Sequence, residues 1–401
     1  MRRNILYVET GYGFGGAVIC LVALLKGLCR ERYIPVVVFS QADNVTRNLL
    51  KDINASIFYV KKYRRREWVN RLLERIAKVR MLKNIVLFGL IFVEMICRIS
   101  LFVKLMEIIK KEKIDIVHIN NCFNSNLEAI FASRLLKVPC VAHVRWGVES
   151  LFSSRFGAKL IPRFIAISEF VKERLRKLGI SDRKIEVVYD GIDVCDCQNK
   201  KSNFQGDNFN KYSFEKHNVG LFACIVWWKG HKVFIEAVNI LIKEKKLKNC
   251  KFFIVGDVVD KKSKLKEELI DLVNKLNLED YIVFTGHQDN VFPFMDKMDI
   301  VVHTSIKPEP FGRVIIEAMA LGKPVIATKM GGPLEMIENG VDGILIEPGN
   351  PEILAEKILF LLSNRDKRIE IGRNAQITAR KKFSIESHVR KIEKIYEEIL
   401  K

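Results

Sequence analysis

The sequence predicts an α/β protein with two Rossmann-like domains, and three observations lead to that prediction. Short apolar runs alternate with helix-length periodic stretches along the chain, which is typical of parallel sheets covered by helices on both faces. The length of 401 residues exceeds one ordinary hydrophobic core. Finally, a polar stretch rich in Asn, Lys and Ser separates the apolar runs into two series.

Each series contains the strands of one domain. The expected strands of the first cover residues 4–9, 34–40, 55–60, 114–120, 140–146, 163–168 and 184–189. Those of the second cover residues 219–226, 251–257, 281–286, 299–305, 324–328 and 343–348. We therefore predict an N-terminal domain (1–195), a linker (196–217), a C-terminal domain (218–383) and a last helix (384–401) that returns toward the N-terminal domain. Ligands of such sheets bind beyond the carboxyl ends of the strands, so a cleft between the two sheets is the expected site.

The charge balance predicts an anionic partner. Lys and Arg number 67 against 47 Asp and Glu, a net charge of +20. Nucleic acid is not expected, because no zinc knuckle, RNP-type strand or basic helix-turn-helix accompanies the charge. The nine cysteines form no C-x-x-C pair and indicate reduced thiols. Since residues 4–8 already resemble a first strand rather than a leader peptide, a cytoplasmic protein is expected.

Residues 61–110 combine basic and apolar character. In residues 61–83, Trp68, Leu72, Ile76 and Val79 recur at helical spacing among many basic residues. An apolar stretch follows, but Glu94 interrupts it, so a spanning helix is not predicted. One interpretation is an anchor on the anionic inner face of the membrane. The other is an ordinary core helix beside a solvated basic one.

A glycine-rich loop follows the first strand. Gly11, Gly13 and Gly16 fit G-x-G-x-x-G, the pattern of a dinucleotide-binding turn. A nicotinamide cofactor would also require an acidic residue at the end of the second strand, where Ser40 and Gln41 stand. The loop therefore predicts phosphate binding at a helix start, and an oxidoreductase is the weaker alternative.

The stretch HTSIKPEPFGRVIIEAMALGKPVIAT, residues 303–328, carries the most chemistry. A strand ends near Thr304, a loop holds Glu309, and a helix begins near Phe311 with Glu317 inside it. The first amides of this helix suit a diphosphate, and an arginine adds charge to them. The residues concerned are Phe311, Gly312, Arg313 and Val314.

Within that stretch, EPFGRVIIE resembles the E-x7-E motif of the retaining glycosyltransferase family four, which has the GT-B fold. The likeness extends over most of the chain. It includes RFIAISEFVKERLRKLGI with KIEVVYDGID at the end of the first domain, WWKGHKVFIEAV as a K-G turn, and GGPLEMIENGVDGILIEPGNP as a closing strand. The resemblance implies a sugar nucleotide donor, with the N-terminal domain on the acceptor side.

The resemblance also implies roles for individual residues. Glu317 would accept hydrogen bonds from the ribose, and Glu309 would hold hydroxyls of the donor sugar. Lys229 would neutralise the diphosphate leaving group. Taken alone, a loop glutamate such as Glu309 or a lysine before glycine says little about function.

In the first domain, Gly15 and Gly16 match the glycine loop of the family, whose amides face the same diphosphate. His143 matches a position that contacts the donor sugar, although a lone histidine is often structural. Cys224 is a departure, because the family usually carries an arginine there; Arg313, Lys229 or Arg145 would have to replace it. A catalytically inactive glycan- or membrane-binding protein is therefore an alternative.

No D-x-D motif occurs in the chain, so no metal or other cofactor is expected. In the family's retaining reaction the sugar–phosphate bond loosens first, and the leaving phosphate then helps to remove the acceptor's proton. The protein positions the partners and stabilises charge. With the basic segment, this favours a glycan or lipid-linked acceptor, such as a growing cell-surface glycan.

Overall fold

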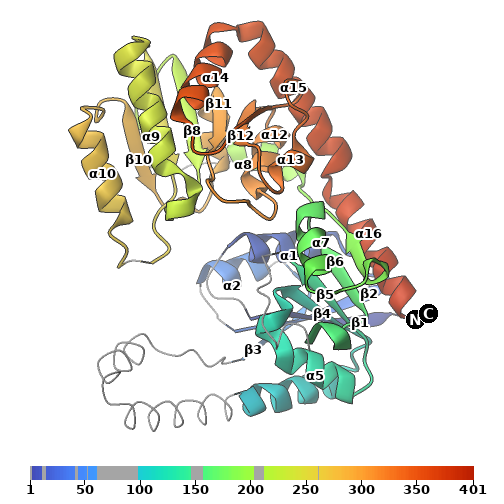
Figure 1. The fold of residues 1–401 in the computed structure, drawn as a ribbon. Coiled ribbons are helices and arrows are strands. Elements are labelled where there is room, and N and C mark those ends of the chain that lie inside the picture. Colours follow the sequence, from blue (N-terminus) through green and yellow to red (C-terminus); the bar gives the residue numbers. More distant parts are fainter. Residues whose placement is uncertain are drawn as a thin grey trace, which may run out of the picture. The chain divides into compact units, whose positions relative to one another are not determined.

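The computed structural model describes residues 2–10, 15–40, 44–51, 53–60, 98–145, 157–202, 212–260 and 262–401. The chain forms two compact units, each with its own parallel sheet (Figure 1). Unit 1 comprises residues 1–167, 171–188 and 389–401, and unit 2 comprises 168–170 and 189–388. The basic segment 61–83 and the apolar residues that follow it to position 97 lie outside the described residues.

Unit 1 is a seven-stranded sheet in the order β3-β2-β1-β4-β5-β6-β7. Its strands are β1 (Arg3–Glu9), β2 (Tyr33–Phe39), β3 (Ser56–Tyr59), β4 (Ile116–Asn121), β5 (Cys140–Val144), β6 (Arg163–Ala166) and β7 (Ile185–Val187). Its helices include α1 (Gly16–Gly27), α2 (Asn44–Leu50), residues 98–111, α5 (Leu127–Leu135) and α7 (Glu169–Lys177). Because the strand order reverses between β1 and β4, the carboxyl ends of these two strands flank a switch point where α/β sheets bind ligands.

Unit 2 is a six-stranded sheet in the order β10-β9-β8-β11-β12-β13. Its strands are β8 (His217–Phe222), β9 (Cys250–Val255), β10 (Ile282–Gly286), β11 (Ile300–His303), β12 (Val325–Thr328) and β13 (Ile344–Ile346). Its helices include α8 (Val194–Ser202), α9 (His231–Asn239), α10 (Leu265–Lys275), α11 (Phe292–Lys297), α12 (Arg313–Ala320), α13 (Pro333–Met336), α14 (Pro351–Ser363) and α15 (Arg365–Lys382). The strand order reverses between β8 and β11.

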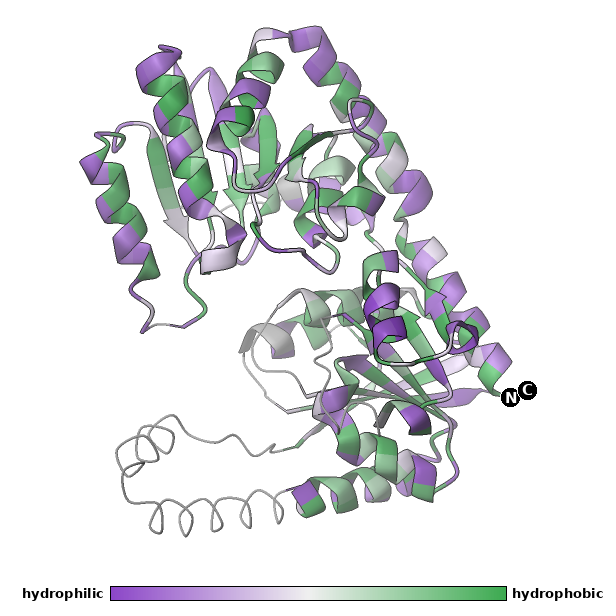
Figure 2. Ribbon diagram, viewed as in Figure 1, coloured by the Kyte–Doolittle hydropathy of each residue, from purple (hydrophilic) through white to green (hydrophobic). Residues whose placement is uncertain are grey.

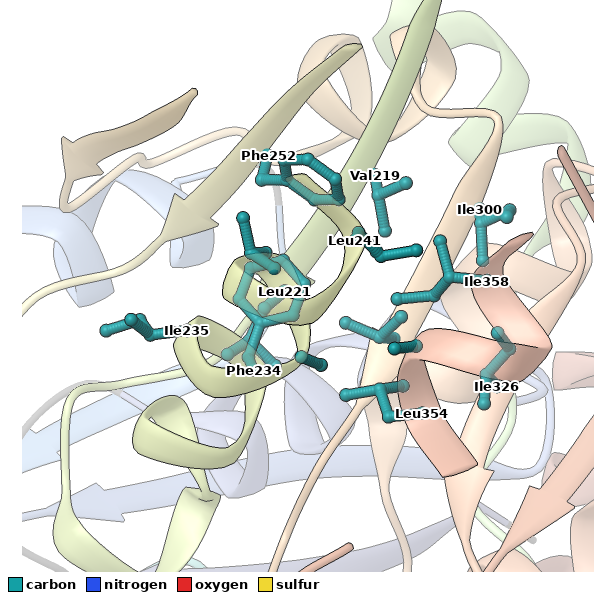
Figure 3. Close-up of a cluster of buried hydrophobic side chains, with 14 of the residues drawn as sticks. Val219, Leu221, Phe234, Ile235, Leu241, Phe252, Ile300, Ile326, Leu354 and Ile358 are labelled. Atoms are coloured by element: carbon teal, nitrogen blue, oxygen red, sulfur yellow. The ribbon is translucent and has the colours of Figure 1, made fainter. Parts of the chain in front are cut away.

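The core of unit 2 lies between its sheet and the helices α9 and α14. Phe234 of α9 and Leu241, in the turn that directly follows α9, belong to the same cluster as Phe252 and Val219 of the sheet. All four side chains are fully buried (Figure 3). Figure 2 shows the corresponding pattern in sequence: strands are mainly hydrophobic, whereas the helices α10 and α15 alternate between hydrophilic and hydrophobic residues. Continuous apolar strands are typical of parallel sheets covered on both faces, as the sequence predicted.

One stretch differs from its expected secondary structure, whereas the helix expected at residues 384–401 is present. The helix α8 lies within the polar stretch around the predicted linker, and it contacts α11 and α12. Its Cys197 is buried, which anchors one face of an otherwise polar helix to unit 2. The last helix, α16 (Ile385–Ile399), contributes residues from Val389 onward to unit 1. There the Tyr396 hydroxyl lies 2.6 Å from His118 Nδ1, inside the buried core of unit 1.

Candidate functional site

The candidate site of unit 2 lies at the switch point of its sheet. Lys229 ends the short turn Trp227–Lys229 that follows β8, and Glu309 lies in the loop that follows β11. These strands are neighbours in the sheet although the two residues are far apart in sequence. The fold therefore brings together two side chains that the sequence analysis selected separately.

Glu309 is the centre of a compact polar cluster. Its Oε1 accepts a hydrogen bond from Lys229 Nζ at 2.5 Å, and its Oε2 lies 2.5 Å from His303 Nε2. Ser305 Oγ donates to the same Oε2 at 3.1 Å. The Lys229 and Glu309 side chains are only 12% and 14% exposed. An ionised carboxylate offers about four lone-pair sites, so three donors leave one for a ligand hydroxyl.

The charges of this cluster hold the carboxylate ionised. Burial alone would raise the pKa of Glu309, but the Lys229 ammonium and the His303 ring outweigh burial and hold that pKa well below its ordinary value. Glu309 is therefore an anion at neutral pH, and Lys229 has a fixed counter-charge beside it.

Backbone contacts fix the loops that carry the cluster. Thr304 Oγ1 donates to the carbonyl of Lys229 at 2.9 Å, and Gly332 N donates to the carbonyl of Glu309 at 2.8 Å. Gly230 has φ 72°, and a Cβ there would lie 1.9 Å from the carbonyl oxygen of Thr304. Only glycine permits this approach of the two loops, which brings Lys229 to Glu309.

The helix α12 begins immediately after Glu309. It starts at Arg313, two residues later than the sequence suggested, because Gly312 takes φ 108° and ends the preceding loop. Phe311 is 4% exposed and is thus mainly a packing residue, and the positive end of the helix dipole lies at the turn that follows it. Arg313 Nε donates to Glu317 Oε1 at 2.7 Å. The expected phosphate-binding arginine and ribose-binding carboxylate therefore lie side by side.

Gly15 and Gly16 lie at the start of α1 in unit 1. Gly15 has extended backbone angles and Gly16 is helical, so neither conformation requires glycine. A Cβ built at either position would meet no described atom within 4 Å. Among the described residues, neither packing nor backbone strain requires glycine at these positions, and their contact with the diphosphate stays a prediction.

His143 is fully buried in β5 of unit 1. Its Nδ1 lies 3.3 Å from a terminal nitrogen of Arg145, whose Nε donates to Asn120 Oδ1 at 3.1 Å. Asn120 also donates to Glu9 at the end of β1. His143 thus belongs to a group of polar side chains at the ends of three neighbouring strands. Its contact with a donor sugar stays a prediction. That residues of unit 1 face the cluster of unit 2 also stays a prediction.

His303 and Ser305 are site residues that were not predicted from the sequence. The histidine ends β11 and the serine follows two residues later, at a strand end where parallel sheets bind ligands, so position along the strand was the available signal. Cys224 is exposed in the loop after β8. Among the described residues, no group of three or more His, Cys, Asp or Glu side chains is arranged to hold a metal ion.

His231, the first residue of α9, should make the stability of the protein depend on pH. Burial lowers the pKa of His231 from its ordinary value near 6.5 to about 4. Between pH 6.5 and pH 4 the unfolded chain therefore binds a proton at His231 that the native protein does not bind. The contribution of His231 to the free energy of unfolding is accordingly at its full value above pH 6.5 and falls as the pH is lowered toward 4. At pH 5 we expect His231 to cost about 2 kcal/mol relative to pH 7.

The test compares the thermal midpoints of native protein and His231→Asn between pH 7 and pH 5. The variant is expected to lose less stability over this interval than the native protein does. His287→Asn is the control for the loss of a histidine as such, because this side chain is 64% exposed. Equal slopes for all three proteins would show that His231 titrates normally.

Comparisons with known proteins bear on the family and the fold of the chain. The model of the family described as Glycosyltransferase Family 4 matches residues 14–195, and the model described as Glycosyl transferases group 1 matches residues 207–378. An uncharacterised glycosyltransferase from Methanocaldococcus jannaschii is 28% identical over 390 residues, covering 94% of this chain and 99% of that protein.

Two further similar proteins have more specific descriptions. The UDP-Gal:alpha-D-GlcNAc-diphosphoundecaprenol alpha-1,3-galactosyltransferase of Escherichia coli is 27% identical over 332 residues, covering 76% of this chain and 82% of that protein. The crystal structure of Anabaena HepE in complex with UDP has a TM-score of 0.76 at 24% identity, covering 99% of this chain and 100% of that one. The fold is therefore the two-domain GT-B fold, and with both family models matched along its length the chain belongs to glycosyltransferase family 4.

Proposed function

We propose that this protein is a retaining, metal-independent glycosyltransferase that moves a sugar from a nucleotide-diphosphate donor to a lipid-linked or cell-surface glycan precursor. The observation that carries the proposal is the Lys229–Glu309–His303 cluster beside the first turn of α12. A largely buried cation beside the positive end of a helix dipole suits the charge that develops on a leaving diphosphate. A fixed carboxylate with one lone-pair site remaining suits a hydroxyl of the donor sugar.

The arrangement of Glu317 and Arg313 supports a nucleotide-diphosphate donor. Their ion pair holds one carboxylate oxygen of Glu317 in place, a turn inside the helix whose amides would bind phosphate. A ribose on Glu317 would put its diphosphate at that first turn. The structures of Anabaena HepE contain UDP or UDP-glucose in the same fold, which supports a nucleotide sugar as donor.

The acceptor and the membrane contact rest on other observations. The E. coli relative is named for a diphosphoundecaprenol acceptor. In this chain the basic segment 61–83 would meet anionic headgroups. No helix in the described part of the chain is long and apolar enough to cross a bilayer. We therefore propose peripheral binding at the inner face of the membrane, and charge reversal of Arg64 to Arg66 should reduce the protein's binding to anionic liposomes.

The donor is tested by ligand-induced thermal shift with UDP, GDP, ADP and CMP. One diphosphate is expected to stabilise the native protein, and Glu317→Ala is expected to weaken its binding roughly 10- to 100-fold, because hydrogen bonds to a carboxylate contribute about 1.5–3 kcal/mol. Glu356→Ala removes an exposed helix carboxylate of α14 and should keep the shift. A native-sized shift in Glu317→Ala would contradict the ribose assignment.

The reaction class has its own measurements. Retention predicts that the new glycosidic bond keeps the anomeric configuration of the donor, which NMR of the product reports. Metal independence predicts the same turnover with and without EDTA. Inversion of the anomeric centre would overturn the first part of the proposal, and loss of turnover restored by a divalent cation would overturn the second. No turnover or hydrolysis with any nucleotide sugar would favour the inactive binding protein.

A further inference from the structure

Unit 1 carries an apolar hollow that the proposed reaction does not use. It has a volume of about 710 Å³ and lies between the helix formed by residues 98–111 and α5. Its apolar walls are Ile99, Phe102, Leu127, Phe131 and Leu135. Three of them are unusually open for large apolar side chains: Leu135 is 63%, Ile99 53% and Phe131 40% exposed. A hollow of this size matches the sites that bind small amphiphilic molecules.

A second hollow adjoins the first and is cationic. It measures about 870 Å³, and its described lining includes Arg134, Lys137, Lys159 and Lys184 but no carboxylate. Lys184 Nζ donates to the carbonyl of Ile161 at 3.2 Å, which fixes its ammonium at the wall. Four cations without a counter-charge in the lining form a local field that favours an anion.

Arg134 and Lys137 line both hollows, so the cationic hollow lies directly beside the apolar one. At the opposite end of the apolar hollow, Arg98 is neutralised by Glu128 at 3.0 Å. The excess positive charge is therefore concentrated at one end of an apolar groove. This is the charge distribution complementary to a hydrocarbon chain with an anionic head.

The cationic hollow lies at the opposite end of the unit 1 strands from the residues assigned to the reaction. The cationic lining lies just before the starts of three strands: Pro139 precedes β5, Pro162 precedes β6, and Lys184 precedes β7. Gly15, Gly16 and His143 lie at the opposite, carboxyl ends of the strands, where α/β sheets bind substrates. A lipid phosphate held in the cationic hollow is therefore not the group that receives the sugar.

We propose that these two hollows form one binding site for an anionic phospholipid of the bilayer, with an acyl chain in the apolar hollow and the phosphate in the cationic one. The biological setting rests on the proposed membrane-peripheral function. The residues, however, are separate both from the donor cluster and from the basic segment 61–83. The site makes membrane binding selective for an anionic headgroup.

The test is flotation of the full-length protein with phosphatidylcholine vesicles that contain or lack phosphatidylglycerol. Leu135→Glu and Lys137→Glu are each expected to lower the fraction bound to anionic vesicles roughly tenfold. Ile369→Glu is the control for the apolar change, since Ile369 is 55% exposed in unit 2. Lys110→Glu is the control for the charge change, because this lysine is exposed on the helix 98–111 but does not line either hollow.

The position of the acyl chain in the apolar hollow is tested with phosphatidylglycerol that carries a photoreactive group in its acyl chain. Crosslinks are expected within residues 98–137 and should be lost in Leu135→Glu. Crosslinks elsewhere, equal binding of Leu135→Glu and Ile369→Glu, or competition by a polyprenyl phosphate but not by phosphatidylglycerol would each overturn the proposal. The donor thermal shift is measured on the same variants and should be unchanged. If no nucleoside diphosphate shifts the thermal midpoint of the native protein, the proposed function is contradicted but the lipid site is not.

Discussion

Lys229→Met is expected to lower kcat by roughly 10²- to 10³-fold, the usual cost of removing one donor that stabilises developing charge. The Lys229 side chain is only 12% exposed and lies beside Glu309 and Trp228, with Nζ 4.5 Å from the centre of the indole ring. It can therefore meet a leaving diphosphate without first shedding a full water shell. An ammonium has three N–H donors, and Glu309 takes one of them.

Steady-state kinetics with a sugar nucleotide separate this role from simple binding. If Lys229 acts on the leaving group, kcat falls more than the donor KM rises, because charge on the phosphate grows in the transition state. Lys232→Met is the matched control: this lysine lies three residues further along, is 70% exposed, and pairs with Glu236 across one helical turn. A kcat within threefold of native in folded Lys229→Met would contradict the assignment.

Lys229→Arg provides a second comparison. It keeps the charge but replaces a compact ammonium with a planar guanidinium. The loop beside Lys229 is held by Gly230, whose missing Cβ allows contact with Thr304. Since this loop has little freedom to move, we expect the arginine variant to recover only part of the activity. Full recovery would show that charge alone suffices and that its position matters little.

The strands could be predicted from sequence because buried parallel strands are continuous apolar runs between turns. Each expected run overlaps an observed strand, but β8 ends at Phe222 while the apolar pattern continues to Val226. There the apolar character reflects burial of Ile225 in the core cluster of unit 2 rather than an extended sheet. Similarly, α8 was hidden by its Asn and Lys content, since only a few of its side chains, such as Cys197, are buried.

Contacts in the candidate site could be predicted only between residues that are close together in the sequence. Arg313 and Glu317 are four residues apart on one helix, so their pairing follows from helical spacing. Lys229 and Glu309 meet only because β8 and β11 are neighbours in the sheet, and sheet order is not encoded in local periodicity. His303 looked like an ordinary strand residue, and its 2.5 Å contact with Glu309 gives it a place in the site.

Glu309→Gln is expected to reduce kcat by roughly 10²- to 10³-fold while nucleoside diphosphate affinity changes little. The substitution keeps the shape but removes the charge that accepts from Lys229, His303 and Ser305. The neutral amide would hold the Lys229 ammonium and the donor sugar less firmly in the reactive geometry, and both interactions act on the groups whose charge changes in the transition state. Nucleotide affinity should persist because the ribose is assigned to Glu317.

The contrast between the two glutamates is the decisive comparison. Glu317→Ala should lose the thermal shift with the nucleoside diphosphate, whereas Glu309→Gln should keep the shift and lose transfer. Glu347→Gln serves as the control, since this carboxylate is 64% exposed and lies 3.6 Å from Lys329. If Glu309→Gln instead lost nucleotide binding and transfer in equal measure, Glu309 would act through the shape of the binding loop.

The pH dependence of the same variant separates charge from packing. Because the native pKa of Glu309 lies well below its ordinary value, the carboxylate stabilises the fold fully above the unfolded pKa near 4.3 and loses this contribution as pH falls below it. The stability difference between native protein and Glu309→Gln should therefore be constant from pH 7 to pH 5 and shrink at lower pH. A difference that does not shrink in acid would assign the effect of the substitution to packing, and Lys229 would then lack the fixed counter-charge on which its role depends.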